Sequence, residues 1–512
     1  MRFFRIGRNA GILYISIMKK IIHSSILTFF LSIYFISAQD PAARDLSFEM
    51  GIVGPIAFQG APIQSRLLTR TLVLPGDKIL VYGSFSTFSS VQSIARLYPD
   101  GNIDPTFICP LYGIVRKIMH LPDGKLLVGG GFMGSFSNPG LEDIVRLHPD
   151  GQLDTTFQQV SFTSDYPEVI NPFVTDFDVD AEGRILLAGN FSSVNGESHR
   201  SLVRLMPDGS IDYTFDIGSG PSHEWGLTAV LVHSDGRILI GGHTTSWNGI
   251  DVGTTTVLLS NGSADTTFSY NDWIYNREWV FAKQPDGKVI RYRAQYNAQS
   301  NFYFSRLNVD LSQDTLFDPP SMEGLINSVT VQSDGKILIS GVSINNTLGL
   351  LRLLPNGNLD TSLDVGEGFG ELDYIRVISA SLQSTGKIIV THDASSYRGE
   401  SLMVEENGSM WIDFVIRLDG EPSAPVFNDN VYFPDQLNIW PNPTEYAFFV
   451  ETGTHYLGNN SFISISDMQG REVFRDYIIQ STQRIETTAW PSGIYIVYVE
   501  GVGVGKVVVG GR

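Results

Sequence analysis

Apolar and polar residues alternate in a short unit that recurs along most of the chain. Its clearest copy is Arg146–Phe157 (RLHPDGQLDTTF), with close copies at Arg96–Phe107 and Arg204–Phe215 and looser ones at Val257–Phe268, Arg306–Phe317 and Arg352–Leu363. Two apolar-alternating runs joined by Pro-Asp-Gly predict a β-hairpin. Pro fixes φ, Asp can bond its own backbone, and Gly accepts a positive φ.

The spacing also predicts the register of this hairpin. With a three-residue loop at Pro149–Gly151, Leu147 faces Leu153 and Arg146 faces Asp154. The copies repeat both pairs: Leu97 with Ile103, Arg96 with Asp104, Leu205 with Ile211, Arg204 with Asp212, Leu353 with Leu359 and Arg352 with Asp360. An apolar pair and an opposite-charge pair both favour this register. The Arg and Asp could be mistaken for catalytic groups, but their repetition indicates a scaffold.

A second turn alternates with the first and sets the period. Its glycines stand at 76, 124, 183, 236, 287, 335 and 386, a spacing of 48 to 59 residues, and each precedes a strand-like run such as Lys125–Gly129 (KLLVG). The first turn trails it by 22 to 27 residues, with the seventh placed at Gly408. Seven units of two hairpins, or four strands each, predict a seven-bladed β-propeller. With the small C-terminal β-sandwich described below, the predicted fold class is all-β.

These motifs resemble the delta-60 repeat family of secreted bacterial proteins over residues 40 to 418. The resemblance implies propeller blades. Three units depart from the pattern: Val257 replaces the Arg in unit four, Ile290–Arg293 interrupts unit five, and unit seven has Met403 and Trp411 where Arg and Asp are expected.

Two segments compete to close the ring. Asp45–Phe48 (DLSF) resembles an Asp-x-Thr-Phe strand without the strand before it, so it could complete a blade begun at the C-terminus. Unit seven also has a candidate fourth strand of its own at Trp411–Leu418. The pattern leaves both open.

The N-terminus carries a predicted signal peptide, residues 1–38, whose true start is placed at Met18. Basic Lys19 and Lys20 precede the apolar run Ile21–Ile36, and cleavage is expected between Ala38 and Gln39. A membrane anchor is the alternative, but the run is short and ends at small residues. Export is therefore expected, with a secreted or outer-surface location and no transmembrane helix in the mature chain.

The net charge and the cysteine content limit the classes of partner and the redox chemistry expected of the chain. The chain has a formal net charge of −19, and the leader holds five basic and no acidic residues, which leaves −24 on the mature protein. This charge disfavours nucleic acid as a partner. The single Cys109 excludes an intramolecular disulfide, and its apolar context favours a small core residue over a reactive thiol.

No motif predicts a cofactor, metal or catalytic residue. Asp176, Asp178, Asp180 and Glu182 alternate as in a calcium loop, but the sixth position is Ala181 where such loops need glycine. A strand with polar outward residues is the preferred interpretation. The chain has no HExxH, GxSxG or P-loop pattern.

A candidate ligand site is expected where the repeat deviates, in units four and five. In a four-stranded meander both short turns of a unit lie on one face, and the long connections lie on the other, where binding is usually found. We call the latter the long-loop face. Aromatic residues beside Asp and Asn there suit stacking on a sugar ring: Trp225, Trp247, Tyr270, Trp273 and Tyr275. The alternative is that these rings pack loops onto the blades.

The last eighty residues differ from the repeat. After a linker at 421–433, residues 434–512 show short alternating strands with turns near Gly470 and Gly493, which predict a small β-sandwich. The segment resembles the type A C-terminal sorting domain of the type IX secretion system, on Pro441-Asn442-Pro443, Gly470, Gly493, Tyr495 and Lys506. The resemblance implies passage through that secretion machinery. A generic adhesive sandwich is the alternative.

Residues 39–420 therefore form the predicted functional domain, and three functions remain open. A non-catalytic module that binds a glycan or a protein is favoured, because rings with polar rims suffice for it. An extracellular carbohydrate-active enzyme, a lyase or hydrolase, would need converging acids; Glu224, Asp272 and Glu278 are available but no spacing singles them out. A purely structural surface component is the third.

Overall fold

The protein is described from a computed structural model. In the propeller it describes residues 42–48, 69–86, 91–134, 143–165, 169, 172–222, 226–242, 244, 246–252, 255–268, 276–295, 302–344, 347–370, 377–406, 409–412 and 414–420. In the C-terminal domain it describes 438–440, 447–451, 462–467, 472–477, 482–488, 490–491, 493–499 and 503–509. The leader, Ala38 and Gln39, and the linker lie outside these ranges. All regular structure in them is β-strand.

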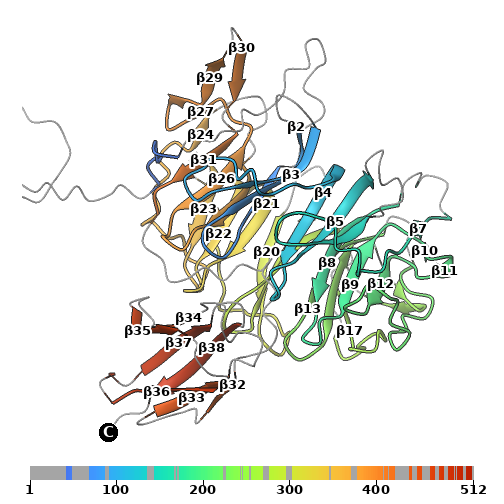
Figure 1. Ribbon diagram of the computed structural model, residues 1–512. Coiled ribbons are helices and arrows are strands. Elements are labelled where there is room, and N and C mark those ends of the chain that lie inside the picture. The colour runs from blue at the N-terminus through green and yellow to red at the C-terminus, as the bar shows by residue number, and fades with distance from the viewer. Residues whose placement is uncertain are drawn as a thin grey trace, which may run out of the picture.

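Seven three-stranded antiparallel sheets repeat along the propeller (Figure 1). Their strands, innermost first, are β1 (Arg70–Val73), β2 (Ile79–Ser86), β3 (Val91–Leu97); β4 (Leu111–His120), β5 (Leu126–Gly134), β6 (Ile144–Leu147); β8 (Val174–Val179), β9 (Ile185–Gly189), β12 (Leu202–Leu205); β13 (Leu227–Val232), β14 (Ile238–Gly242), β17 (Thr255–Leu258); β18 (Asn276–Lys283), β19 (Val289–Gln295), β20 (Phe302–Leu307); β21 (Glu323–Val331), β22 (Ile337–Ile344), β23 (Thr347–Leu353); β25 (Val377–Leu382), β26 (Ile388–His392), β31 (Val415–Leu418).

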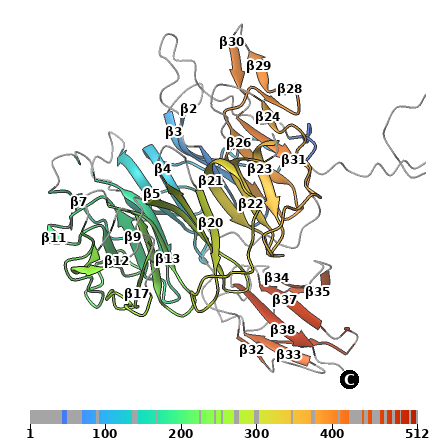
Figure 2. The same cartoon turned by 180° about the vertical axis from the view of Figure 1, so that it is seen from behind.

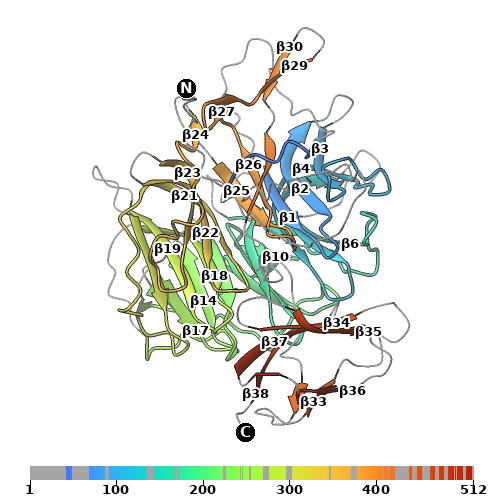
Figure 3. The same ribbon diagram turned by 90° about the vertical axis from the view of Figure 1, so that its left-hand side faces the viewer.

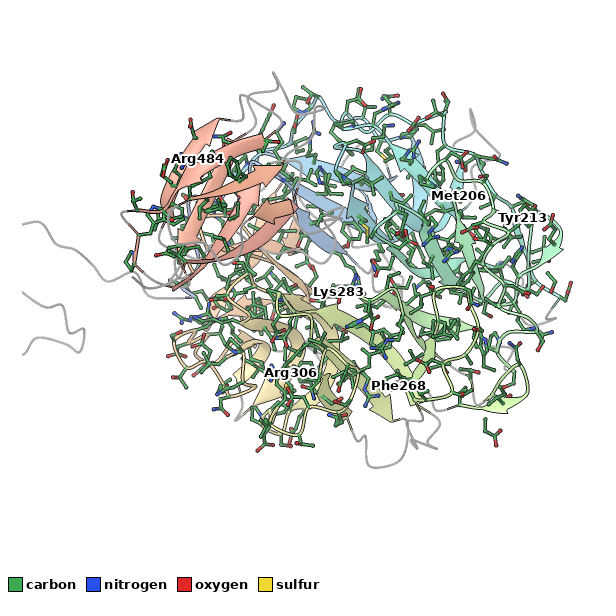
Figure 4. The ribbon with its side chains drawn as sticks, turned by 90° about the horizontal axis from the view of Figure 1, so that it is seen from below. Met206, Tyr213, Phe268, Lys283, Arg306 and Arg484 are labelled. Atoms are coloured by element: carbon green, nitrogen blue, oxygen red, sulfur yellow. The ribbon has the colours of Figure 1, made fainter. Side chains whose placement is uncertain are left out.

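The sheets pack side by side into a closed ring. Each innermost strand contacts the sheet that precedes it in the chain, and β1 of the first sheet contacts β25 and β26 of the last. Figure 4 shows the sheets around a common centre, with Lys283 of β18 close to it. The middle strands β9, β14 and β26 are buried at every position. A blade with a neighbour on each face needs such continuous apolar strands, which explains why these runs do not alternate.

The predicted hairpin register is confirmed. Leu147 bridges Leu153, and the Asp154 amide donates to the Arg146 carbonyl at 2.8 Å. The loop closes through the His148 amide to the Gln152 carbonyl, with Gly151 at φ +91°. Equivalent bridges join Leu97 to Ile103, Leu205 to Ile211 and Leu353 to Leu359. Each sheet thereby gains a short fourth, outer strand.

The N-terminal segment supplies that outer strand for the last blade. Arg44 bridges Leu418, the Asp45 amide donates to the Arg417 carbonyl at 2.8 Å, and Phe48 is buried beside the Arg417 guanidinium. We call residues 42–48 the closing segment. Of the two candidates left open by the pattern, it is the N-terminal one that closes the ring.

The boundaries predicted for unit seven were wrong. Its third strand is β31, so Arg417 and Leu418 hold the places that the pattern assigned to Met403 and its neighbours. Residues around Gly408 belong instead to an inserted hairpin, β29 (Met403–Glu406) with β30 (Ser409–Ile412). This hairpin extends beyond the blade in Figures 1 and 3. Unit five, despite its irregular sequence, forms an ordinary sheet.

Three blades carry a small extra layer, formed by a hairpin between their second and third strands and, in two of them, by a strand that precedes the first. We call these layers arms. They are β7 (Phe162–Thr163) with β10 (Ser193–Val194) and β11 (Glu197–Ser198); β15 (Ser246–Trp247) with β16 (Ile250–Asp251); and β24 (Phe369–Gly370) with β27 (Ser396–Tyr397) and β28 (Glu400–Ser401). In Figure 1 the first arm (β7, β10, β11) lies at one side of the ring and the third (β24, β27) at the other. Because their hairpins are inserted in the long connections, the arms add to the long-loop face.

The C-terminal domain is a separate β-structure of two sheets (Figure 2). One sheet joins β32 (Asn438–Trp440), β33 (Ala447–Glu451) and β36 (Thr482–Glu486); the other joins β35 (Glu472–Tyr477), β34 (Phe462–Asp467), β37 (Gly493–Val499) and β38 (Gly503–Val509). Alternate residues from both sheets form one core that includes Phe448, Ile465, Val497 and Val507. This is the predicted sandwich.

Candidate functional site

The recurrent Arg and Asp form a buried clasp between neighbouring blades. In blade three the Arg204 Nε donates to Asp212 Oδ2 at 2.7 Å, and its guanidinium lies 4.6 Å from the Phe215 ring centre. Its Nη1 reaches the next blade and donates to the Ser260 carbonyl at 2.6 Å. Arg96, Arg146, Arg306 and Arg417 repeat this arrangement, each reaching the turn carbonyl of the following blade.

The lysine of the second turn joins the clasp in several blades. Lys125 Nζ lies 3.1 Å from Asp154 Oδ2, and Lys288 Nζ lies 2.8 Å from Asp314 Oδ2. In blade four, where Val257 replaces the arginine, Arg237 instead stacks over Phe268 at 4.8 Å. The clasp thus holds strand register within a blade and also joins consecutive blades.

These partners keep the clasp carboxylates ionised. Burial alone raises the pKa of Asp360, but hydrogen bonds from Ser362 and the charge of Arg352 outweigh it and hold the pKa at about 2. The pKa values of Asp104 and Asp154 are lowered in the same way, against the effect of burial, by their threonine and basic partners. The repeat motif therefore serves structure.

The alternating acids of β8 are also engaged in structural contacts. Asp176 Oδ2 accepts the Val230 amide at 2.9 Å and Asp178 Oδ2 accepts the Val232 amide at 2.7 Å, both from the free edge of the next innermost strand. Asp180 pairs with Arg184 at 2.6 Å. A buried backbone amide without a hydrogen-bond acceptor destabilises the fold, so these carboxylates stabilise the contact between neighbouring blades. Within the described residues no group of acids, histidines or cysteines is arranged to hold a metal.

Cys109 lies partly buried against the core shared by the first two blades. Burial raises the pKa of its thiol to about 12, which keeps it protonated and unreactive at neutral pH.

Only one of the five predicted ligand-binding aromatics lies in the described residues. Trp247 is fully buried in the core of blade four, so its ring offers no face to a ligand. Trp225, Tyr270, Trp273 and Tyr275 lie outside the described ranges, and their role stays a prediction.

A second repeat, within the arms, explains the burial of Trp247. The arms share a motif at Ser193–Ser198, Ser246–Asp251 and Ser396–Ser401 (SVNGES, SWNGID, SYRGES). Val194, Trp247 and Tyr397 occupy its second position and all are buried. Asn195, Asn248 and Arg398 follow with positive φ, as a two-residue hairpin turn requires. Trp247 is therefore the core residue that anchors an arm.

The arms are anchored to the segment that enters their blade. Asn248 Oδ1 accepts the Gly220 amide at 2.9 Å, and Asn195 Oδ1 accepts the Ser161 amide at 2.9 Å. Their outermost strands, β11, β16 and β28, are exposed. The long-loop face thus has three rigid projections with exposed tips.

In the C-terminal domain the structure describes part of the predicted sorting motif. Tyr495 is buried on β37, donates to the Pro491 carbonyl at 2.7 Å and stacks on Trp490 at 4.9 Å. Gly493 begins β37, and Lys506 on β38 pairs with Ile496 on β37. Pro441, Asn442, Pro443 and Gly470 lie outside the described ranges.

Comparison with known proteins agrees with this architecture. The model of a domain of unknown function, the DUF5122 beta-propeller, matches residues 76–107, 121–157, 181–215, 233–268, 284–317 and 332–363. The model of a secretion system C-terminal sorting domain matches residues 438–509. These matches confirm the repeat and the sorting domain. No curated protein matches the chain. No helix in the described part of the chain is long and apolar enough to cross a membrane.

Several solved structures are similar to the chain at low identity. The extracellular domain of BT4673 from B. thetaiotaomicron is 10% identical over 92% of this chain, with a TM-score of 0.35, and this chain spans 59% of that one. PorZ, described as a surface component of the type-IX secretion system of Porphyromonas gingivalis, is 10% identical over 86% of this chain and 81% of its own, with a TM-score of 0.30. A gluconolactonase from Xanthomonas campestris is 13% identical over 75% of this chain and 98% of its own, with a TM-score of 0.34.

The sorting domain marks the chain for export by type IX secretion, and hence for a secreted or outer-surface location. The chain is a β-propeller protein of DUF5122 repeats that carries a C-terminal secretion sorting domain.

Proposed function

We propose that the propeller is a non-catalytic binding module for an extracellular glycan or protein, with its ligand surface on the long-loop face. The observation that carries the proposal is the set of three arms. Each is held by a buried side chain, Val194, Trp247 or Tyr397, and each presents an exposed outer strand. Rigid projections around the ring add ligand-contacting area without changing the blades, and loops on a rigid scaffold are a usual place for binding.

The sequence of the exposed strands supports a polar ligand. Their residues are Glu197–Ser198, Ile250–Asp251 and Glu400–Ser401, so carboxylates and hydroxyls stand at the tips of the arms. Such groups bind the hydroxyls of a sugar or the backbone of a peptide. The aromatic loop 269–275 of unit five would supply stacking between two units of the same face.

A glycan-array screen of the mature chain, residues 39–512, tests the glycan form of the proposal. Retention of a glycan by the wild type, its loss in Trp273→Ala and its persistence in Leu316→Ala is the expected result. Leu316 is the control, because its side chain is 86% exposed at the outer turn of blade five and belongs to no arm. If no glycan is retained, sugar binding is rejected and a protein ligand is left. Turnover of a retained glycan would show that the propeller is a carbohydrate-active enzyme and not a non-catalytic binding module.

A further inference from the structure

Two arginines of the innermost strands take no part in the clasps. Arg70 begins β1 and Arg116 lies within β4. Clasp arginines each bind an aspartate and a carbonyl of the next blade. Within the residues that the structure describes, neither Arg70 nor Arg116 is hydrogen-bonded to a carboxylate or carbonyl, and the Arg116 Nε is buried without a hydrogen-bond partner. A buried guanidinium donor without an acceptor is costly, which makes this place unusual in the ring.

A β-bulge sets the position of Arg116. The register of β4 against β5 shifts between Val115 and Lys117, so Arg116 is the extra residue. Gly130 faces the bulge, where a Cβ would lie 2.2 Å from the Ile114 carbonyl oxygen. A bulge redirects a side chain out of the regular alternation, and bulges are common beside binding sites.

Other blades show what a bulge residue does when its role is structural. Thr175 occupies the same bulge in β8, and its hydroxyl donates to the Leu227 carbonyl of the next blade at 2.7 Å. The side chain of Arg116 also reaches the next blade, but there it stacks on an aromatic ring: its guanidinium lies 4.2 Å from the Phe173 ring centre. Arg116 therefore contacts the next blade through an apolar wall. Its Nε is enclosed there, so its terminal Nη groups are the ones left to donate to a ligand.

The local charges favour an anion. Burial lowers the pKa of Arg116 and the nearby charge of Arg70 lowers it further, while Asp143 raises it. The other described bases of these innermost strands are balanced, because Lys117 pairs with Asp176 at 2.8 Å and Lys283 with Asp178 at 3.3 Å. An oxyanion that accepts from both guanidinium groups would offset the repulsion between their charges.

Both arginines lie toward the long-loop end of the innermost strands. Arg70 is the first residue of β1, which runs to the short turn at Leu74–Asp77, and the bulge at Arg116 faces Gly129 and Gly130, where the pairing of β5 with β6 ends. The pair therefore lies on the side of the ring that carries the arms.

We propose that Arg116 and Arg70 bind an oxyanion, a carboxylate or a sulfate, carried by an acidic sugar at the long-loop end of the innermost strands. The inference rests on the proposed function and names its ligand class as acidic glycans. Phe173 holds the Arg116 guanidinium in place, as a stacked ring does for a planar cation.

Small anions test the site directly. Thermal unfolding of the mature chain is followed with sodium galacturonate, sodium sulfate or galactose, for wild type, Arg116→Gln, Arg70→Gln and the control Arg184→Gln. The Arg184→Gln substitution removes the same charge from the short-turn face, where Arg184 pairs with Asp180. Either anion should raise the unfolding temperature of the wild type and of Arg184→Gln. Its affinity for Arg116→Gln and for Arg70→Gln should be at least ~10-fold weaker. The anion that gives the larger rise in unfolding temperature shows whether the site prefers the carboxylate of galacturonate or sulfate.

The proposal is overturned if galactose stabilises as much as galacturonate, or if Arg116→Gln responds like Arg184→Gln. Retention on immobilised polygalacturonate and on a neutral glycan separates the two proposals. A neutral glycan held equally by wild type and Arg116→Gln supports the binding module and rejects the oxyanion site. Binding of the free anion with no retained polymer supports the oxyanion site and rejects the glycan-binding function.

Discussion

Replacing Arg204 by methionine should destabilise the propeller more than the same change at Arg146. The two arginines occupy equivalent clasps, and their aspartates are almost fully buried. They differ in the second base. Asp154 keeps Lys125 at 3.1 Å when Arg146 is removed. In blade three the lysine position is Arg184, which binds Asp180 and Glu182 and acts on Asp212 only through its charge. Asp212 would therefore keep its hydrogen bonds from Thr214 but no hydrogen-bonded base.

The expected magnitudes follow from this difference. Breaking a buried ion pair by removing one partner costs about 3–5 kcal/mol, because the remaining charge is left uncompensated. Arg204→Met should fall in this range, since the Arg204 side chain is only 3% exposed and also loses its stacking on Phe215. Arg146→Met loses the equivalent stacking on Phe157, but Asp154 retains a charge partner, so the main loss is that of hydrogen bonds to a charged group, about 1.5–3 kcal/mol.

Urea unfolding of the mature chain, followed by circular dichroism, measures both variants. The double variant Arg204→Met/Asp212→Asn should be more stable than Arg204→Met alone, because asparagine leaves no buried charge. Equal losses in the two single variants, or a double variant that is no more stable than Arg204→Met, would refute the role assigned to the clasp.

Four further outcomes are expected. Phe48→Ala, which removes a buried ring from the closing segment, should cost about 3–5 kcal/mol in urea unfolding, while Leu46→Ala, 72% exposed two residues away, should change stability by less than about 0.5 kcal/mol; similar values for both would contradict ring closure by this segment. Trp247→Ala should also cost about 3–5 kcal/mol, and an unchanged melting temperature would show that its ring is not a core residue. Because the folded-state pKa of Asp360 is lowered to about 2, its contribution is complete above the unfolded value near 4 and is lost as pH falls toward 2; acid titration of Asp360→Asn should show a shallower loss across that window, and an identical slope would argue against the assigned shift. Deletion of residues 434–512 should abolish secretion, measured by immunoblot of the culture medium and cell surface, and undiminished release would reject the sorting role.

Local pairing could be predicted from the sequence because hairpin partners lie within a few residues of each other. The Pro-Asp-Gly turn, with Leu147 opposite Leu153, depends only on the loop length and the alternation on either side. The fold class then followed from the period. The clasp between blades could not be predicted, since Arg204 meets Ser260 only after two separate units are packed together.

The errors arose where an insertion changed the spacing. In blade seven an arm and the hairpin β29–β30 separate β26 from β31, which moves the Arg-Leu pair to 417 and 418, beyond the usual distance from the preceding turn. Trp247 was misinterpreted because it was weighed as a tryptophan in a loop. Alignment of Ser246–Asp251 with Ser193–Ser198 would have placed it with the buried Val194.

The closing segment has a consequence for the order in which the protein is made. Asp45 and Arg417 are 372 residues apart, so the first folded residues of the mature chain have no partner until almost the whole propeller has been synthesised and has crossed the inner membrane. A contact of such sequence separation forms slowly, because a long loop must be closed before the contact contributes any stability. Until then the last blade has an open edge and the ring has two loose ends. We therefore expect a translocating chain to remain an open, incomplete ring, exposed to periplasmic proteases and chaperones, and to become resistant only in one late step.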